Sequence, residues 1–179
     1  MGRHRLVLRT LTEAGACEIE HWFDDSEIDR RLGGRFWIHR ALRLRDEPAG
    51  EFRGRRVLRS HGWLADDADG TPVAYLGGDV YDRWVRYHGE GKPLTGEISA
   101  RTMSLAYVVD PARWRRGYGR AAIESVLAHP DVADIELWVL GIDSDNVASR
   151  RCAESAGFHL IDSVPDFEDT LYYQREALT

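Results

Sequence analysis

The sequence predicts a single-domain α/β (α+β) fold for residues 1–179, and three observations support this prediction. In the second half of the chain, apolar runs of strand length alternate with helical patterns, which indicates a sheet covered by helices. The length of 179 residues is that of one ordinary domain. Hydrophobic residues make up 43% of the chain, which is enough to build a core rather than a disordered chain.

The first half of the chain mixes strand and helix patterns. Alternating residues predict strands, a 3.6-residue apolar period predicts helices, and Gly, Pro and Asp-Gly pairs mark the ends of elements. In chain order, the expected elements are a strand at residues 5–11, a helix at 14–34 that stops at Gly33-Gly34, a short helix at 35–47, two strands around an Asp-Gly turn at 62–82, and a polar loop at 83–97.

The second half carries the clearest alternation. A dense apolar run, TMSLAYVVD, has strand length and ends at Pro111, so we expect it to be a central strand. The helix after it places Ile123, Val126 and Leu127 on one face and closes at Pro130. The remaining expected elements are a strand at 133–141, a helix at 145–157 with Asn146 as its N-cap, and strands at 158–164 and 170–177.

Charge is unevenly distributed along the chain. The net charge is −6, but residues 30–59 hold ten Arg against three acids, so the rest of the chain carries −13. This balance argues against nucleic-acid binding, which needs a dominant basic face. The basic segment is interpreted as a solvated helix face and loop, with an anionic partner as the alternative.

Other features exclude further classes. The sequence has no run of eighteen apolar residues and no signal peptide, which predicts a cytoplasmic protein that makes no membrane contact. Two cysteines, Cys17 and Cys152, make no disulfide framework. The seven histidines show no paired ligand spacing, so no metal site is predicted. The expected oligomeric state is a monomer or a homodimer.

Residues 110–124, DPARWRRGYGRAAIE, combine a strand end, two glycines and a helix start. The N–H groups and dipole of a helix N-terminus favour an anion, and glycines let the backbone approach it closely. A pyrophosphate or phosphate cradle is one interpretation, and a plain strand-to-helix turn with surface arginines is the other. The residues that would form the cradle are Arg115, Arg116, Gly117, Tyr118, Gly119 and Arg120.

A second motif, DNVASRRCAESAGF at residues 145–158, favours the cradle. Together, residues 104–158 resemble the GNAT superfamily of acyl-CoA-dependent N-acetyltransferases, whose pattern is a strand, an R/Q-x-x-G-x-G/A loop, a helix, a strand and N-x-x-[AS]-x7-G-F. The residues that match are Gly117, Gly119, Asn146, Ser149, Gly157 and Phe158. The resemblance implies a mixed, mostly antiparallel sheet splayed at its central strands, with acetyl-CoA as the acyl donor and no metal.

The resemblance also implies cofactor contacts beyond the loop. It places Val109, Asn146 and Ser149 at the cofactor, with backbone N–H groups near Val109 polarising the thioester carbonyl. Trp114 stands at the usual R/Q position. Ala153 stands where many members carry a tyrosine that protonates the CoA thiolate, so Ser149 or water must supply that proton. A packing or capping role for Ser149 is the alternative.

A finer similarity is to aminoglycoside 6′-N-acetyltransferases and their siderophore acyltransferase relatives. It implies an antibiotic-resistance enzyme whose acceptor cleft is formed in part by the first helix and the loop after it. The strand acid usual in that branch is missing from MSLAY, so the general base must lie elsewhere. The candidate bases are Glu97 and Asp79, and the candidate acceptor contacts are Trp22, Asp24, Asp25, Tyr81 and Asp82. For these acids, a solvated surface role is the alternative.

The expected function is acetyl-CoA-dependent N-acetylation of a small cationic amine, because acids outside residues 30–59 would concentrate cations. At neutral pH, deprotonating such an amine costs about 4–5 kcal/mol, part of which a general base recovers. The alternatives are a protein N-terminus or lysine, a siderophore, and a non-catalytic CoA- or partner-binding domain of the same fold.

Overall fold

The computed structural model describes residues 4–47, 50–85, 87–88, 92–93 and 97–177. The chain divides into two compact units, each built from separate stretches of sequence. Unit 1 comprises Met1–Pro48, Ser60–Gly77 and Tyr107–Val126, and unit 2 comprises Ala49–Arg59, Gly78–Ala106 and Leu127–Thr179.

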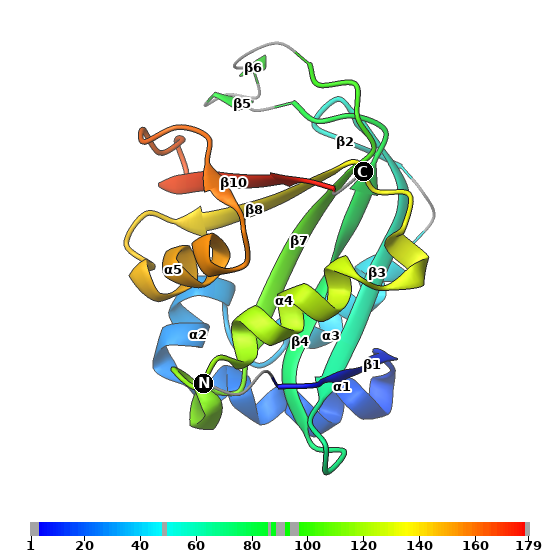
Figure 1. The fold of residues 1–179 in the computed structure, drawn as a ribbon, viewed down its shortest axis with the longest axis vertical. Helices are drawn as coiled ribbons and strands as arrows, with labels where there is room; N and C mark the ends of the chain where they lie inside the picture. The colour runs from blue at the N-terminus through cyan, green and yellow to red at the C-terminus, as the bar shows by residue number, and fades with distance from the viewer. Residues whose placement is uncertain (1–3, 48–49, 86, 89–91, 94–96, 178–179) are drawn as a thin grey trace. The chain divides into compact units, whose positions relative to one another are not determined.

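An eight-stranded sheet has the strand order β1-β3-β4-β7-β8-β10-β9, with β2 paired to β3 off this path (Figure 1). β7 and β8 are parallel, whereas β1–β3, β2–β3, β8–β10 and β9–β10 are antiparallel. The sheet is therefore mixed and mostly antiparallel, as predicted, and β7 stands in the middle of the order. The strands are β1 (Val7–Thr10), β2 (Glu51–Phe52), β3 (Arg55–Asp66), β4 (Pro72–Tyr81), β7 (Thr102–Val109), β8 (Leu137–Asp143), β9 (His159–Leu160) and β10 (Thr170–Glu176).

The helices are α1 (Glu13–Ile19), η1 (Glu20–Asp24), α2 (Ser26–Leu32), α3 (Trp37–Arg45), η3 (Pro111–Arg113), α4 (Tyr118–Leu127), η4 (Pro130–Val132) and α5 (Val147–Ser155). The single helix predicted at 14–34 is wrong, because this segment forms α1, the 3-10 helix η1 and α2. Asp25 has an extended backbone, and its carboxylate accepts the N–H groups of Glu27 at 3.0 Å and Ile28 at 3.3 Å. An Asx N-cap of this kind starts a new helix and ends the one before it.

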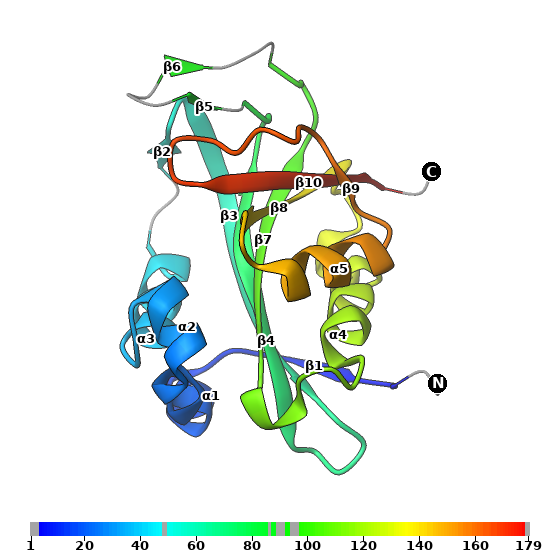
Figure 2. The same cartoon turned by 90° about the vertical axis from the view of Figure 1, so that its left-hand side faces the viewer.

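Unit 1 packs three helices against strand segments. Figure 2 shows α1, α2 and α3 on one side of the strands and α4 on the other. Between α1–α3 and the strands lies a hydrophobic core of buried helix residues together with Leu64, Tyr75 and Val108 of the strands. α4 buries Ala121, Ala122, Ile123 and Val126, which is the apolar face that the sequence period predicts.

Unit 2 is organised around β8 and β10. They pair along seven residues, from Leu137↔Glu176 to Asp143↔Thr170, and α5 packs against β8 and β9. The predicted loop at 83–97 contains a two-stranded sheet, β5 (Tyr87–His88) with β6 (Lys92–Pro93), and its other residues lie partly outside the described ranges. No helix in the described part of the chain is long and apolar enough to cross a membrane.

The boundaries of several strands differ from the predicted ones. β3 begins at Arg55 rather than at residue 62, because a turn at Arg53 and Gly54, both at positive φ, pairs Arg55 with Phe52 of β2. β8 begins at Leu137, since the segment before it forms η4 and a turn. The second strand of the hairpin is as expected, with Gly70 in the turn at φ +74°.

Within unit 2, β7 and β8 pair over only part of their length. β7 and β8 pair only over Thr102–Ser104 with Leu137–Val139 among the described residues, although β7 continues to Val109 and β8 to Asp143. The splay that the resemblance implies stays a prediction, and this short pairing agrees with it.

Candidate active site

The loop between β7 and α4 in unit 1 holds the predicted pyrophosphate cradle. The carboxylate of Asp110 accepts the N–H of Ala112 at 2.9 Å and so caps η3. Arg115 has φ +61° and Gly117 has φ +88°, so two residues with left-handed backbone conformation lie on either side of Arg116. Such interruptions turn successive backbone N–H groups toward one side and form anion-binding concavities.

α4 begins immediately after this turn. Its first helical hydrogen bond joins the N–H of Ala121 to the carbonyl of Gly117 at 3.1 Å. The N–H groups of the preceding residues therefore belong to the open first turn, where a helix leaves its donors without intrahelical acceptors. Arg115 and Arg116 are exposed, and Arg120 pairs with Glu124 at 2.8 Å. The backbone and charge suit a phosphate group, and the role of these residues in cofactor binding stays a prediction.

The side chain of Tyr118 is fixed from two sides. The ring of His4 stacks on it with centroids 4.1 Å apart, and His4 Nε2 lies 2.8 Å from the carbonyl of Arg116. Arg113 Nη1 donates to the Tyr118 hydroxyl at 3.3 Å and also pairs with Asp67 at 3.4 Å. These contacts engage the ring and the hydroxyl of Tyr118 with other groups of the protein. Sequence reasoning missed His4, which no motif marks.

Val109, the last residue of β7, is anchored through its carbonyl. That carbonyl accepts the indole N–H of Trp114 at 2.8 Å, and the N–H of Asp110 donates to Val73 at 3.0 Å. Trp114 therefore closes the turn back onto the strand, which gives it a structural role at the position where the family pattern has R/Q.

Asn146 and Ser149 meet at the start of α5 in unit 2. The Asn146 side-chain oxygen accepts the N–H of Ser149 at 3.1 Å, which confirms the predicted N-cap. Gly157 follows the helix at φ +85°. Ala153 is completely buried, so the position that carries a tyrosine in many members is enclosed here.

A polar cluster lies at the end of β4 in unit 2. Asp79 is half-buried, and its carboxylate accepts the hydroxyl of Tyr81 at 3.1 Å. Tyr81 is buried, and burial together with Asp79 raises the pKa of its hydroxyl well above the usual range. Tyr81 therefore stays protonated at neutral pH and remains a donor to Asp79. Arg55 lies over the rings of Tyr81, at 4.3 Å, and Trp84, at 4.5 Å.

Asp79 stands beside the point in unit 2 where the pairing of β7 with β8 ends. A Cβ atom on its neighbour Gly78 would lie 1.8 Å from the carbonyl oxygen of Ser104, so β4 and β7 are in close backbone contact here. Ser104 is also the last residue of β7 that pairs with β8. Asp79 is thus a half-buried carboxylate next to the point where the pairing of β7 with β8 ends.

The other candidate base, Glu97, is in a different environment. Its side chain is 46% exposed and pairs with Arg83 Nη1 at 3.2 Å. Arg83 also lies 3.7 Å from Asp82, whose carboxylate accepts the N–H of Arg56 at 2.9 Å. Glu97 and Asp82 are therefore both held in a surface network around one arginine.

The acidic residues of the first helical region have structural partners within unit 1. Asp24 forms two hydrogen bonds with the guanidinium of Arg35, which lowers the pKa of the Asp24 carboxyl. Asp25 is the cap of α2, and Glu27 pairs with Arg30 and Arg31. Trp22 is only 3% exposed and belongs to the hydrophobic core, which argues against direct contact between its ring and an acceptor.

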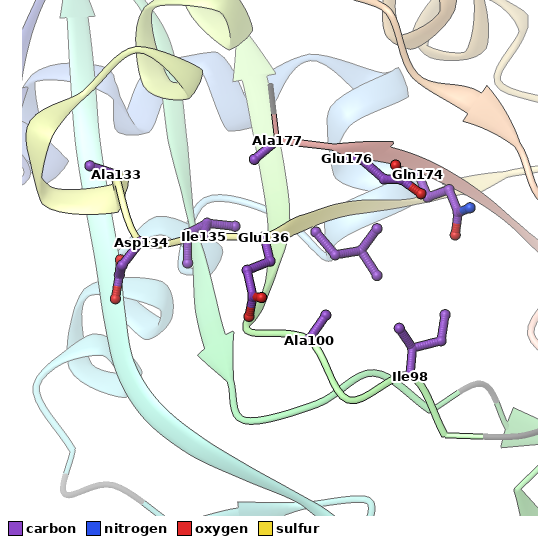
Figure 3. A pocket seen from close by; sticks show the side chains of 10 residues that line it. Ile98, Ala100, Ala133, Asp134, Ile135, Glu136, Gln174, Glu176 and Ala177 are labelled. Carbon is purple, nitrogen blue, oxygen red and sulfur yellow. The ribbon is translucent and has the colours of Figure 1, made fainter. Parts of the chain in front are cut away.

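A groove of about 560 Å³ in unit 2 was not expected from the sequence (Figure 3). It is lined by Ile98 and Ala100 ahead of β7, by residues 133–137 that lead into β8, and by the end of β10 with Ala177. The lining includes three acidic residues, Asp134, Glu136 and Glu176. Arg101 binds two of them, through Nη1 to Asp134 and through its N–H to Glu136, both at 2.7 Å. None of the predicted site residues lines this groove.

Comparisons with known proteins identify the class. Residues 5–159 match the model of an acetyltransferase (GNAT) domain, and the chain belongs to this family. A curated relative, the uncharacterized N-acetyltransferase YfmK of Bacillus subtilis strain 168, is 28% identical over 152 residues, which is 83% of this chain and 81% of the relative. The chain is therefore a GNAT N-acetyltransferase, and the non-catalytic alternative falls away.

Solved structures share the fold at low identity. An aminoglycoside N(6′)acetyltransferase from Legionella pneumophila has a TM-score of 0.67 at 14% identity and covers 99% of this chain and 95% of its own. The spermidine N-acetyltransferase of Vibrio cholerae in complex with CoA and spermine has a TM-score of 0.66 at 11% identity, with 96% and 95% coverage. Similarity at these identities supports the fold prediction.

Proposed function

We propose that this N-acetyltransferase transfers an acetyl group from acetyl-CoA to a primary amine of a small cationic molecule, of the polyamine or aminoglycoside kind. The observation that carries the acceptor class is Asp79, a half-buried carboxylate beside the residue at which β7 leaves β8. The amine substrates named for the structural neighbours, an aminoglycoside and spermine, belong to the same chemical class.

The donor site is assigned to the turn before α4. The left-handed residues Arg115 and Gly117 and the open first turn of α4 supply N–H groups, and a pyrophosphate is the anion that such a turn favours. The solved neighbour that contains CoA supports acetyl-CoA as the donor. Asn146 and Ser149 are assigned to the same cofactor, with the cap of α5 as their structural role.

The reaction requires one bond to form and one to break. The neutral amine nitrogen attacks the thioester carbonyl carbon, the carbon–sulfur bond breaks, and CoA leaves as a thiolate that takes up a proton. The nitrogen loses a proton during the reaction, so a base must accept that proton and an acid must donate one to the CoA thiolate. Preorganised N–H donors near Val109 would stabilise the oxyanion by about 3–4 kcal/mol.

Asp79 is the stronger of the two base candidates. It is half-buried and held by Tyr81, whereas Glu97 is exposed and paired with Arg83. A positioned base contributes about 10²–10⁴ in rate, comparable with the cost of deprotonating an alkyl ammonium at neutral pH. A carboxylate at this position both attracts the ammonium and receives its proton.

The steering acids predicted in the first helical region are less suited to substrate binding. Asp24 is neutralised by Arg35, and Asp25 is used as a helix cap. We therefore assign cation recognition to Asp79 with Tyr81 beside it. The thiolate proton has no tyrosine source at residue 153, so Ser149 or water supplies it.

The experiment is to measure release of free CoA thiol from acetyl-CoA with a panel of amines at low and high salt. The panel contains spermidine, an aminoglycoside, a peptide with a free N-terminus, a lysine peptide and a neutral amine. The proposal expects the highest kcat/KM for the small polycations, falling steeply with salt because screening weakens capture of a charged substrate. Preference for a peptide or a neutral amine, or a flat salt dependence, would contradict it.

A further inference from the structure

Three residues with metal-binding side chains converge on the outer surface of α1 and α3 in unit 1. Glu13 and Cys17 are one helical turn apart on α1, and His39 reaches them from α3. One ligand atom from each residue lies within 4.8 Å of the other two. His39 is 26 positions from Glu13, so sequence spacing gave no sign of this cluster.

The imidazole of His39 is oriented by two carboxylates. Its Nδ1 lies 3.1 Å from Glu13, and its Nε2 lies 3.1 Å from Glu20. The side chain of His39 is only 17% exposed, so its ring position is fixed more tightly than that of a surface histidine. Metal-binding histidines commonly donate their second ring N–H to a carboxylate, which fixes the tautomer and ring orientation.

The two helices that carry these residues, α1 and α3, are anchored by packing in the hydrophobic core. Ala16 and Ile19 of α1 and Ile38 of α3 are completely buried in one core cluster. Ala16 and Ile38 directly precede Cys17 and His39 in the sequence, so the core holds the backbone of Cys17 and His39 in place.

We propose that Glu13, Cys17 and His39 form a binding site for a borderline transition-metal ion, and that this ion is Zn²⁺. Thiolate, imidazole and carboxylate are all zinc ligands, and a soft sulfur disfavours Mg²⁺ and Ca²⁺. One thiolate and one carboxylate balance the double positive charge. Binding releases the thiol proton of Cys17, because the thiolate is the ligand.

The geometry requires only small adjustments. Tetrahedral zinc with bonds of about 2.0–2.3 Å separates its ligand atoms by about 3.3–3.6 Å. The present separations extend to at most 4.8 Å, and Glu13 and Cys17 are exposed and free to change rotamer. Nδ1 of His39 would face the metal with Glu13, Nε2–H would donate to Glu20, and water would take the fourth position. The ion would then link α1 to α3.

The test is a zinc titration of the metal-free full chain in competition with a chromophoric chelator. The proposal expects one equivalent of Zn²⁺ per chain. Cys17→Ser and His39→Gln should each weaken binding by at least about 100-fold, and Glu20→Gln by about 10–100-fold as the orienting carboxylate. Cys152→Ser, which changes the other cysteine, is the matched control and should bind as the unchanged protein does.

A spectroscopic measurement covers the case in which a variant is misfolded. Co²⁺ added to the unchanged protein should give the thiolate-to-cobalt charge-transfer band and the intense visible bands of a four-coordinate site, both abolished by stoichiometric Zn²⁺. Equal zinc affinity in Cys17→Ser and the unchanged protein, or a Co²⁺ spectrum that lacks the thiolate band, would overturn the proposal.

Discussion

Gly78→Ala tests the close approach of β4 and β7 on which the placement of Asp79 depends. The added Cβ would lie 1.8 Å from the carbonyl oxygen of Ser104 and 2.9 Å from its carbon. An ordinary carbon–oxygen contact is about 3.3 Å, so the strands would have to separate locally by about 1.5 Å. A ladder hydrogen bond stretched by that amount is lost, because N–H···O bonds are confined to about 2.7–3.2 Å.

The magnitude follows from the contacts that must give way. Two ladder bonds at about 0.5–1.5 kcal/mol each, together with about 1–3 kcal/mol of overpacking strain, lower the free energy of unfolding by about 2–6 kcal/mol. The assay is equilibrium unfolding in urea, with CoA binding and kcat measured on the fraction that remains folded. We expect kcat to fall as well, because Asp79 is displaced.

Gly62→Ala is the matched control, since Gly62 also lies in a strand but its Cβ would meet atoms no closer than 3.5 Å. It should change the free energy of unfolding by less than about 1 kcal/mol. If Gly78→Ala were as stable as Gly62→Ala and fully active, the strand approach described here would be wrong.

Three further predictions concern the cofactor loop, the cap of α5 and the acidic surface. Gly117→Glu should abolish CoA binding in calorimetry, because it puts a carboxylate where the phosphates are proposed to sit and strains a residue at φ +88°; native affinity in a folded variant would move the cradle elsewhere. Asn146→Ala removes the acceptor for the N–H of Ser149 and should cost about 1 kcal/mol, or about 2–4 °C in Tm; an unchanged Tm would exclude the cap. Arg35→Gln should reduce the loss of stability on acidification, because Arg35 lowers the pKa of Asp24 in the folded state. The stabilisation from this ion pair is complete above the unfolded pKa of about 3.9 and is lost as pH falls through the folded pKa. An equally steep fall in the free energy of unfolding with acid in the variant would reject this pairing.

Features set by local chain chemistry were predictable from the sequence. Pro111 and Gly117 mark the end of β7 and the start of α4, and Asn146 and Gly157 bracket α5. Each of these residues fixes the backbone within a few positions of itself, so the pattern in the sequence is the pattern in the structure. The GNAT resemblance depended on the same local motifs, which is why family and fold followed from them.

Features set by topology were not predictable in the same way. The pairing of Asp24 with Arg35, the burial of Arg55 on Tyr81 and the approach of His39 to Cys17 join residues from different elements. Counting acids predicted a steering surface, but contacts such as the Asp24–Arg35 ion pair are decided only when the chain is folded. The choice between Asp79 and Glu97 also rests on burial, which a strand-end position in the sequence does not reveal.

The most direct test of Asp79 as the general base compares Asp79→Asn with Glu97→Gln in steady-state acetylation of spermidine, with CoA affinity measured in parallel. Asparagine retains an oxygen that can accept the Tyr81 hydroxyl but cannot take a proton, so Asp79→Asn isolates the base from the structure around it. We expect Asp79→Asn to lower kcat/KM by about 100-fold or more with unchanged CoA affinity, and Glu97→Gln to change kcat/KM by less than about 3-fold. A near-normal rate for Asp79→Asn, or an equal loss for Glu97→Gln, would contradict the assignment of Asp79 as the general base.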